Sequence, residues 1–271
     1  MDRTLPIYTI EGTDFIVDVA NLQLREKENT QNTIKIFDMS DLEDRYVFHY
    51  NPQIKNIPSQ RSEYNNSIII EMPELVKLDP QGMSEKYNVA NVEGKNDFEV
   101  MVDQDALQSR IKLGKLPTID IAGHTFYADA RINLLRPKDD FMTMGIKFSE
   151  IQPYFFEDKD RYIIPYNPKT HEFQEPDYDK ITQYPKDLLV IEFPHERILD
   201  PVGWNRYNGF SETYDLKETG LKLEFKARII PWNEIGIDHT IQRNIEKLRQ
   251  QKDQPTENYK KGNRARRRPK L

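Results

Sequence analysis

Nearly the same five residues occur twice in this chain, as part of a longer internal repeat. LDPQG occupies residues 78–82 and LDPVG occupies residues 199–203. When the sequence is aligned with itself, the offset begins at 111 and grows to 121. Self-similarity over such a distance is typical of a chain built from copies of one unit. We therefore expect an internal duplication that gives two tandem homologous modules.

Four blocks match in the same order, so the similarity does not rest on one motif. The pairs are LPIYTIEGTDFIVD (5–18) with LPTIDIAGHTFYAD (116–129), LR (24–25) with LR (135–136), DRYVFHYNP (44–52) with DRYIIPYNP (160–168), and IEMPELVKLDPQG (70–82) with IEFPHERILDPVG (191–203).

The shared residues are mostly ones that set the backbone. The Asp, Pro and Gly of each LDPxG block fall at positions one, two and four of a four-residue turn, which are the preferences of a type I turn. Each Asn-Pro pair is expected to end a strand, because proline cannot donate to a ladder. Gly12 and Gly123 each separate two short apolar runs, as in a β-hairpin. We expect these residues to be retained for structure rather than for catalysis.

The pattern of each copy predicts a strand-rich α+β module of antiparallel strands closed by a short helix. Residues 221–229 alternate apolar and charged side chains, which predicts one half-buried strand, and residues 98–102 are its expected counterpart. Leu107 and Ile111 indicate the closing helix of the first copy. Residues 237–248 carry apolar side chains at helical spacing and predict that of the second.

We expect three segments along the chain. They are module one at residues 1–113, module two at residues 114–250, and a disordered basic tail at residues 251–271. No Gly/Ser linker separates the modules, which favours close packing.

The composition and the absence of common motifs limit the possible chemistry. The chain has no cysteine, which excludes disulfides and thiolate metal sites and suits a reducing cytoplasm. No apolar run is long enough to span a membrane, and the first residues do not resemble a signal peptide. Phosphate-binding glycine loops, dinucleotide fingerprints, HExxH and GxSxG are missing. We expect a cytoplasmic protein with no cofactor, no metal and no membrane partner.

Acid and base groups in module two leave a hydrolase as the alternative function. His124 aligns with Thr13, and His195 aligns with Glu74, so these histidines are particular to the second copy. The candidate acid–base residues are His124, Asp129, Glu192, His195 and Asp200. The competing interpretation makes His124 an exposed turn residue and Asp129 a strand end.

The segment GWNRYNGF at residues 203–210 is the candidate surface for a protein partner. It contains tryptophan, arginine and tyrosine, the types enriched at binding hot spots. The candidate partner-binding residues are Trp204, Arg206 and Tyr207. Packing of Trp204 into the core is the alternative.

The last thirteen residues form a basic tail on an acidic body. The tail carries seven cations and no acid, so the net charge of −6 leaves −13 on residues 1–258. The cations are Lys260, Lys261, Arg264, Arg266, Arg267, Arg268 and Lys270. Such an arm suits contact with the phosphates of DNA or RNA, or with an acidic protein surface. A tail without function, or one that folds over its own acidic body, is the alternative.

Module two resembles a known group of proteins. LPTIDIAGHTFYADARINLLRPKDDF, YNPKTHEFQE and FPHERILDPVGW resemble uncharacterised proteins encoded on mobile and conjugative elements of Bacteroidetes-type bacteria, over residues 114–245. Module one departs from the pattern, with LREKENT in place of LRPKDDF. The resemblance implies an accessory role on such an element and brings no catalytic residues.

The sequence thus favours a non-enzymatic interaction or scaffold protein. Its tandem modules would bind an unidentified protein partner, and its tail would bind nucleic acid or an acidic surface.

Overall fold

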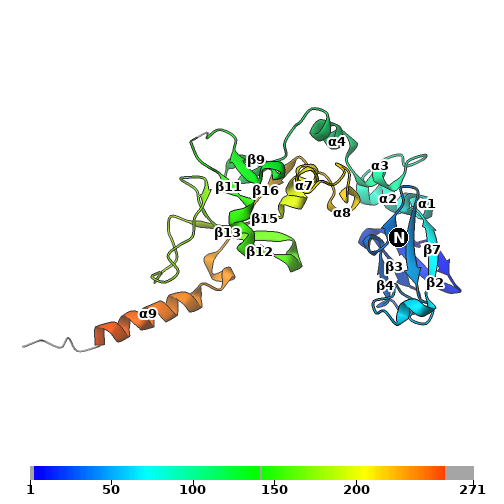
Figure 1. Ribbon diagram of the computed structural model, residues 1–271, viewed down its shortest axis with the longest axis horizontal. Helices are drawn as coiled ribbons and strands as arrows, with labels where there is room; N and C mark the ends of the chain where they lie inside the picture. Colours follow the sequence, from blue (N-terminus) through cyan, green and yellow to red (C-terminus); the bar gives the residue numbers. More distant parts are fainter. Residues whose placement is uncertain (1–2, 141, 254–271) are drawn as a thin grey trace, which may run out of the picture.

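The computed structural model describes residues 3–140 and 142–253 (Figure 1). We call the elements from β1 to α3 the N-terminal module, and those from α4 to α9 the C-terminal module. Figure 1 shows the modules side by side, with α4 and α8 near their junction and α9 projecting away from the far side. The prediction of a strand-rich α+β fold with antiparallel sheets is confirmed.

The N-terminal module contains a four-stranded sheet, a three-stranded sheet and three short helices. The strand orders are β1-β2-β3-β4 and β5-β6-β7. The elements are β1 (Ile7–Ile10), β2 (Thr13–Asp18), η1 (Val19–Asn21), β3 (Gln23–Glu26), β4 (Thr33–Lys35), η2 (Ile36–Asp38), β5 (Ser40–Asp41), β6 (Arg45–Tyr50), η3 (Glu63–Asn66), β7 (Ile68–Pro73), α1 (Leu75–Leu78), α2 (Pro80–Tyr87) and α3 (Asp97–Met101).

The C-terminal module contains two five-stranded sheets. One has the order β11-β10-β9-β8-β16, and the other has the order β12-β13-β15-β17 with β14 also paired to β13. The elements are α4 (Gln104–Ile111), β8 (Thr118–Ile121), β9 (His124–Asp129), η4 (Ala130–Ile132), β10 (Leu134–Pro137), β11 (Ile146–Lys147), α5 (Phe148–Ile151), η5 (Gln152–Tyr154), β12 (Phe155–Phe156), η6 (Glu157–Lys159), β13 (Arg161–Asn167), β14 (Glu172–Phe173), β15 (Leu189–Pro194), α6 (Glu196–Leu199), α7 (Pro201–Asn208), α8 (Leu216–Thr219), β16 (Glu224–Lys226), β17 (Arg228–Ile230), η7 (Trp232–Ile235) and α9 (Asp238–Asp253).

Both predicted hairpins are present. The turn residues Glu11 and Gly12 have φ of 47° and 77°, and Ala122 and Gly123 have φ of 54° and 90°. Positive φ at both central residues is the type I′ geometry, whose twist suits two-residue hairpins. The strands join in antiparallel registers, with Ile10 opposite Thr13 and Ile121 opposite His124.

The LDPxG blocks begin helices, so their interpretation as type I turns was wrong. Asp79 caps α2 and Asp200 caps α7, each accepting a hydrogen bond from the glycine N–H three residues on, at 2.9 and 3.1 Å. Proline follows at the first helical position, where its missing N–H costs nothing. The same local chemistry serves a turn and a helix start, and here eight helical residues follow each cap.

An arginine lies against each capping aspartate. Arg3 Nη2 donates to Asp79 Oδ2 at 2.7 Å. Arg110 donates to both Asp200 oxygens, at 2.8 and 2.9 Å, and both of these side chains are almost completely buried. These arginine–aspartate pairs therefore connect α2 and α7 each to the segment that precedes the first strand of its module.

The expected strand at residues 98–102 is a helix, α3, which corrects that prediction. Asn96 accepts from the Glu99 N–H while the Glu99 side chain accepts from the Asn96 N–H, a capping box that starts the helix. The buried Asp97 carboxylate accepts from the N–H groups of Leu75 and Val76, at 2.8 and 2.7 Å, and so joins α3 to the start of α1.

The single strand expected over residues 221–229 is two short strands, β16 and β17. Apolar side chains alternate with exposed charged ones up to Ala227, which is buried. The alternation ends at Ile229, whose side chain is 53% exposed. β16 pairs with β8 in parallel, whereas β17 pairs with β15 antiparallel. The segment therefore crosses from one sheet to the other.

The helix expected to close module one packs on the C-terminal module instead. Leu107 of α4 shares a buried cluster with Val202 and Leu216, and Arg110 binds Asp200. The same cluster includes Val102 and contacts Phe98, so it also joins the modules. A second junction contact is the ion pair of Lys217 with Asp41.

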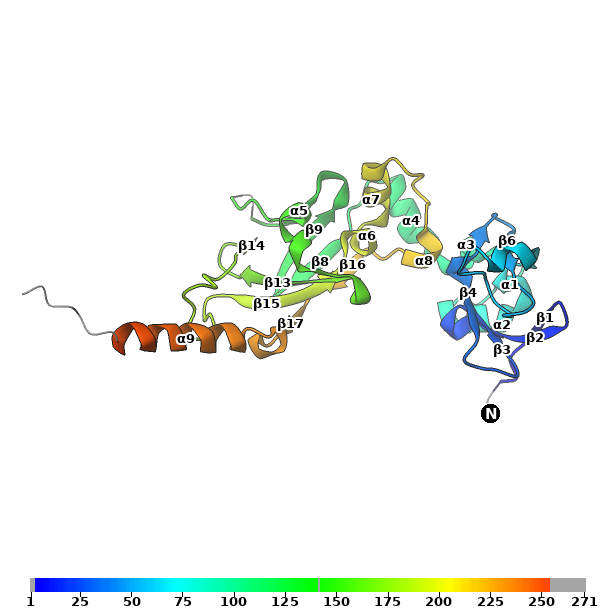
Figure 2. The ribbon, with the colours of Figure 1, turned by 60° about the horizontal axis from the view of Figure 1, so that its bottom comes forward.

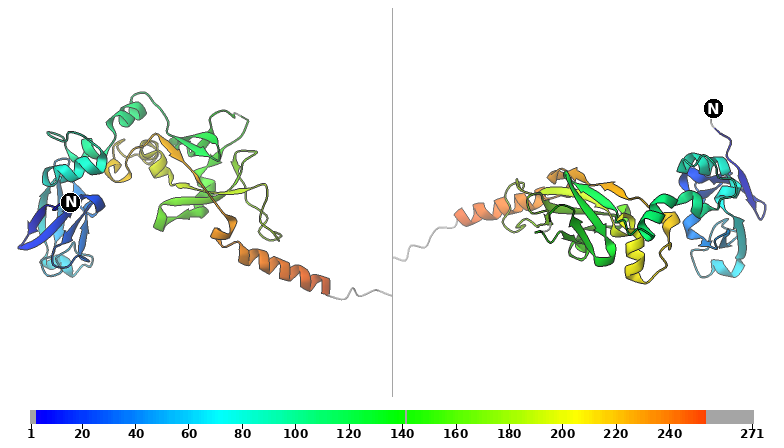
Figure 3. Two further views of the ribbon diagram at one scale, coloured as in Figure 1. Left: turned by 180° about the vertical axis from the view of Figure 1, so that it is seen from behind. Right: turned by 90° about the horizontal axis from the view of Figure 1, so that it is seen from above.

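The predicted helix near the end of the chain is α9 (Figure 2). Ile237 and Ile241 are buried, and the Asn244 side chain donates to the carbonyls of Tyr178 and Ile181, both at 2.9 Å. Leu248 is 47% exposed, so the later turns project away from the sheets (Figure 3). The disordered tail was predicted to begin at residue 251, but residues 251–253 belong to α9, which corrects that boundary. Residues 254–271 lie outside the described part of the chain. Within that part, no helix combines the length and apolar character that crossing a bilayer requires.

Candidate protein-interaction site

Helix α7 and the loop after it present four aromatic side chains. Val202 and Asn205 form the buried side of the helix, while Trp204 and Tyr207, three residues apart, lie on another side. The Asn205 side chain donates to the Tyr214 carbonyl at 2.8 Å and so holds the returning loop against the helix. Gly209 ends the helix at φ 76°.

The rings of Trp204, Phe210 and Tyr214 form a stack. The ring centroids of Trp204 and Phe210 lie 5.8 Å apart at 25°, and those of Phe210 and Tyr214 lie 4.6 Å apart at 20°. Tyr207 is 66% exposed, and Phe210 and Tyr214 are each 44% exposed. We call Trp204, Tyr207, Phe210 and Tyr214 the aromatic face. Its outer surface remains open to a partner.

Two arginines flank the aromatic face, each held by an acid. The Arg197 guanidinium lies 6.0 Å from the Trp204 ring and binds Glu218 at 2.7 Å. Arg206 Nε donates to Glu212 at 2.7 Å. A rigid aromatic surface with positioned arginines has the composition of a binding hot spot.

Of the three predicted partner-binding residues, Trp204 and Tyr207 belong to the aromatic face and Arg206 flanks it. Trp204 is half-buried, so it packs on one side and is accessible on the other. Phe210 and Tyr214 were not among the predicted partner-binding residues. The aromatic spacing of 204, 207, 210 and 214 was the available signal, although Tyr214 comes after the helix and reaches the face only through the loop.

In the described part of the chain, no hydrogen bond or ion pair joins the side chains of any two of the five candidate acid–base residues. His124 begins β9 with its ring 4.0 Å from the His171 ring, and His171 Nδ1 lies 3.2 Å from Asp140. Asp129 is at the opposite end of the same six-residue strand. His124 and Asp129 therefore lie too far apart along the strand to act as an acid–base pair.

Glu192 and Asp200 are engaged in ion pairs. Glu192 binds Arg161 at 2.9 Å and Arg228 at 2.6 Å. Burial acts to raise the pKa of Glu192, but the hydrogen bonds of the two arginines outweigh it and lower the pKa overall. Asp200 is completely buried as the cap of α7 and the partner of Arg110.

His195 caps α6. Its Nδ1 accepts from the Arg197 N–H at 3.2 Å, and its Nε2 lies 3.1 Å from Glu196. Burial lowers the pKa of His195, against the opposite influence of Glu196 and Asp160. The imidazole is thus an acceptor that starts a helix, with Phe155 and Tyr162 packed around it.

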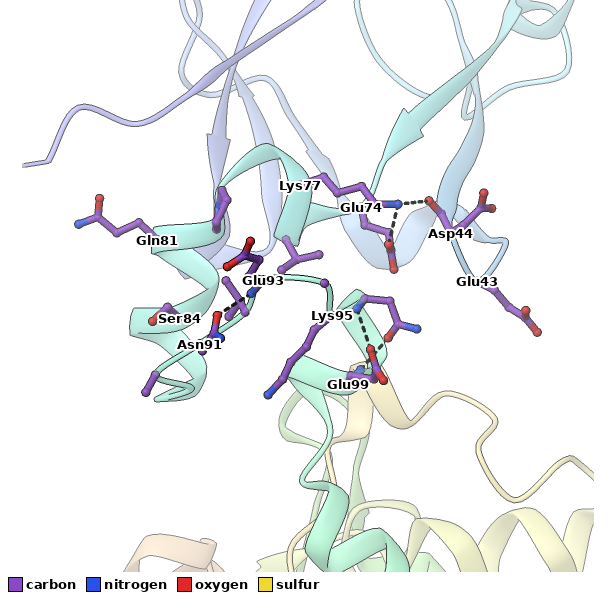
Figure 4. Close-up of a pocket in the computed structure, with 16 residues that line it drawn as sticks. Glu43, Asp44, Glu74, Lys77, Gln81, Ser84, Asn91, Glu93, Lys95 and Glu99 are labelled. Atoms are coloured by element: carbon purple, nitrogen blue, oxygen red, sulfur yellow. Dashed lines mark hydrogen bonds and ion pairs between the residues drawn. The ribbon is translucent and has the colours of Figure 1, made fainter.

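A cavity of about 860 Å³ lies in the N-terminal module between α1, α2 and the segment before α3 (Figure 4). Acidic residues outnumber basic ones along its wall, but some of the acidic side chains accept hydrogen bonds from backbone N–H groups. Glu74 accepts from the Asp97 N–H and pairs with Lys77, and Glu99 completes the cap of α3. In the part of the chain that the structure describes, no three His, Asp or Glu side chains are arranged to hold a metal.

Comparison with protein-family models, with curated proteins and with solved structures finds no match to this chain.

Proposed function

We propose that the chain is an internal duplication of one strand-rich module and that the duplicated pair acts as a non-enzymatic interaction protein. Backbone angles at aligned positions support the duplication. Glu74 and His195 have φ −55° with ψ 152° and 153°, and Asp79 and Asp200 have φ −143° and −141° with ψ 71°. Two copies of one unit would reproduce such angles at aligned positions.

The observation that carries the interaction role is the aromatic face. Four aromatic side chains held by a capped helix and an anchored loop supply a large contact area with little loss of side-chain entropy on binding. The proposed partner is a protein that inserts apolar side chains against this stack. Glu192, His195 and Asp200 are engaged with other groups, which favours this function over a hydrolase.

The basic tail and the resemblance in module two extend the proposal. The tail cations would contact DNA, RNA or an acidic protein surface outside the two modules. The resemblance to proteins of mobile elements suggests that this cytoplasmic accessory role is carried out on such an element.

The test compares capture by three forms of the full chain expressed in the host cell. They are the wild type, a Tyr207→Ser/Phe210→Ser variant, and a Phe156→Ser control, whose side chain is as exposed as Phe210 but lies on another surface. We expect one protein to be captured by the wild type and the control and reduced at least about tenfold with the double variant. Identical captured proteins from all three forms, each folded by circular dichroism, would refute the aromatic face as the partner site.

A further inference from the structure

The C-terminal module covers one edge of each of its two sheets with its own chain. Residues 223–230 run first along β8, where the Thr118 N–H donates to the Leu223 carbonyl at 2.8 Å and the Ala227 N–H donates to the Asp120 carbonyl at 2.8 Å. They then run along β15, with Ile229 opposite Ile191 and Arg228 opposite Glu192. We call residues 223–230 the covering strand.

The covering strand seals β15 from water. Val190, Ile191 and Glu192 are 1%, 0% and 5% exposed. The Arg228 Nε–Glu192 hydrogen bond of 2.6 Å completes the contact from the side of the covering strand. Backbone pairing, apolar burial and one ion pair thus act together at this edge.

The aligned edges of the N-terminal module lack such a strand. β1 and β7 are terminal strands of their sheets, and among residues 3–140 and 142–253 no strand pairs with their outer edges. After α2 the chain passes into α3 and α4 rather than returning between the sheets. Ile69, which aligns with Val190, is 64% exposed, and the Glu71 side chain, which aligns with Glu192, is 62% exposed.

The backbone of β7 is oriented to receive a strand. The Glu71 carbonyl accepts a hydrogen bond of 3.2 Å from the Tyr8 hydroxyl of β1, so it points away from β6. Because backbone groups alternate along a strand, the N–H and carbonyl of Ile69 point the same way. Tyr8 therefore occupies only part of the position that a complete strand fills in the other module.

We propose that the N-terminal module binds an extended segment of a partner protein by strand addition along β7, in the position that the covering strand fills in the C-terminal module. The covering strand indicates the chemistry of this segment. Apolar residues alternate with charged ones, and an arginine or lysine faces Glu71 as Arg228 faces Glu192. Main-chain hydrogen bonds would supply affinity, and the ion pair and apolar positions would supply register. The inference rests on the proposed interaction role but uses a different surface from the aromatic face.

The test uses a synthetic peptide with the sequence of residues 221–230, LKLEFKARII, and the isotopically labelled full chain. NMR titration should shift the amide signals of β1 and β7. Ile69→Pro removes an outward N–H while leaving the hydrogen bonds between β7 and β6. It should weaken binding of the peptide at least about tenfold. Ile132→Pro, at a similarly exposed isoleucine outside the sheets, is the control and should leave affinity unchanged.

A charge exchange tests the register separately. Glu71→Lys should weaken binding of the peptide about threefold or more. A peptide with glutamate in place of its arginine should bind the Glu71→Lys variant with the lost affinity restored. Three outcomes would overturn the proposal: no shifts at millimolar peptide, shifts confined to β8 and β15, or binding unchanged by Ile69→Pro. Concentration-dependent dimerisation abolished by Ile69→Pro would instead assign the edge to a second copy of this chain. Because the peptide assay does not involve Tyr207 or Phe210, its failure is distinguishable from failure of the aromatic face.

Discussion

Replacing Arg110 by methionine should destabilise the C-terminal module far more than any surface substitution. Arg110 and Asp200 are 3% and 0% exposed and share two hydrogen bonds, of 2.8 and 2.9 Å. Methionine fills similar volume and favours helix, but it leaves the Asp200 carboxylate buried with only backbone N–H donors. Removing one partner of a buried ion pair costs about 3 kcal/mol or more.

The assay is urea unfolding followed by tryptophan fluorescence. Both tryptophans, Trp204 and Trp232, lie in the C-terminal module, so their signal reports on that module alone. With a slope of about 2 kcal/mol per M, a loss of about 3 kcal/mol lowers the fluorescence midpoint by about 1.5 M. Asp200→Asn in the Arg110→Met background keeps a capping side chain and removes the unpaired charge, so it should recover about half of the loss.

Arg3→Met is the matched control in the other module. Its side chain is 25% exposed and also binds a capping aspartate, so its effect should be smaller and should appear in circular dichroism rather than in fluorescence. A fluorescence midpoint lowered by less than about 0.5 M in Arg110→Met would refute the reasoning. An equal fluorescence shift from Arg3→Met would show that the modules unfold as one unit.

Three further predictions concern a glycine, a histidine and the tail. Gly203→Ala should destabilise by about 2 kcal/mol in urea unfolding, because an added Cβ would overlap the Asp200 carboxylate, whereas Gly209→Ala, which meets only the strain of its positive φ, should cost about 1 kcal/mol. Burial lowers the pKa of His195, so its neutral form is favoured in the folded state. This stabilisation is present above the unfolded pKa of about 6.5 and is lost as the pH falls through the lower folded pKa. His195→Asn keeps a capping side chain and should flatten this part of the stability profile. A chain that ends at Gln250 should bind DNA or RNA more weakly than the full chain, with a smaller salt dependence, and equal affinities at two salt concentrations would exclude the tail as the nucleic-acid contact.

Local chemistry made the hairpins predictable from sequence, and its limits explain the errors. Gly12 and Gly123 each lie between two short apolar runs, and a glycine in that place favours a tight hairpin turn, so both hairpins could be predicted. Asp-Pro-x-Gly is ambiguous, because the first turn of a helix has the conformation of a type I turn. The residues after the glycine decide, and neither MSEKY (83–87) nor WNRYN (204–208) contains a residue that ends a helix.

The error at residues 98–102 has a different cause. Phe98, Val100 and Val102 alternate as in a strand, but Asn96 and Glu99 form a capping box that selects the helix. The aromatic face was predictable only in part, since Trp204 and Tyr207 share a helix whereas Tyr214 depends on the fold of a loop. The separation of the acid–base candidates depends on tertiary structure, which sequence spacing cannot supply.

The place where the sequence match ends has a physical explanation in the path of the chain. The aligned blocks extend through Gly82 and Gly203. Up to α2 and α7 both modules have four strands, then three strands and then two helices, although the C-terminal module adds α5 and β14. Beyond these helices the chain has different tasks. After α2 the chain continues through α3 to α4, where Arg110 binds the capping Asp200 of α7. After α7 the chain returns between the two sheets of the C-terminal module. Under the proposed duplication, the connection between the modules would itself have removed the covering strand from the first copy. The open edge at β7 is then a consequence of tandem connection, and its exposed isoleucines would persist because a partner strand covers them.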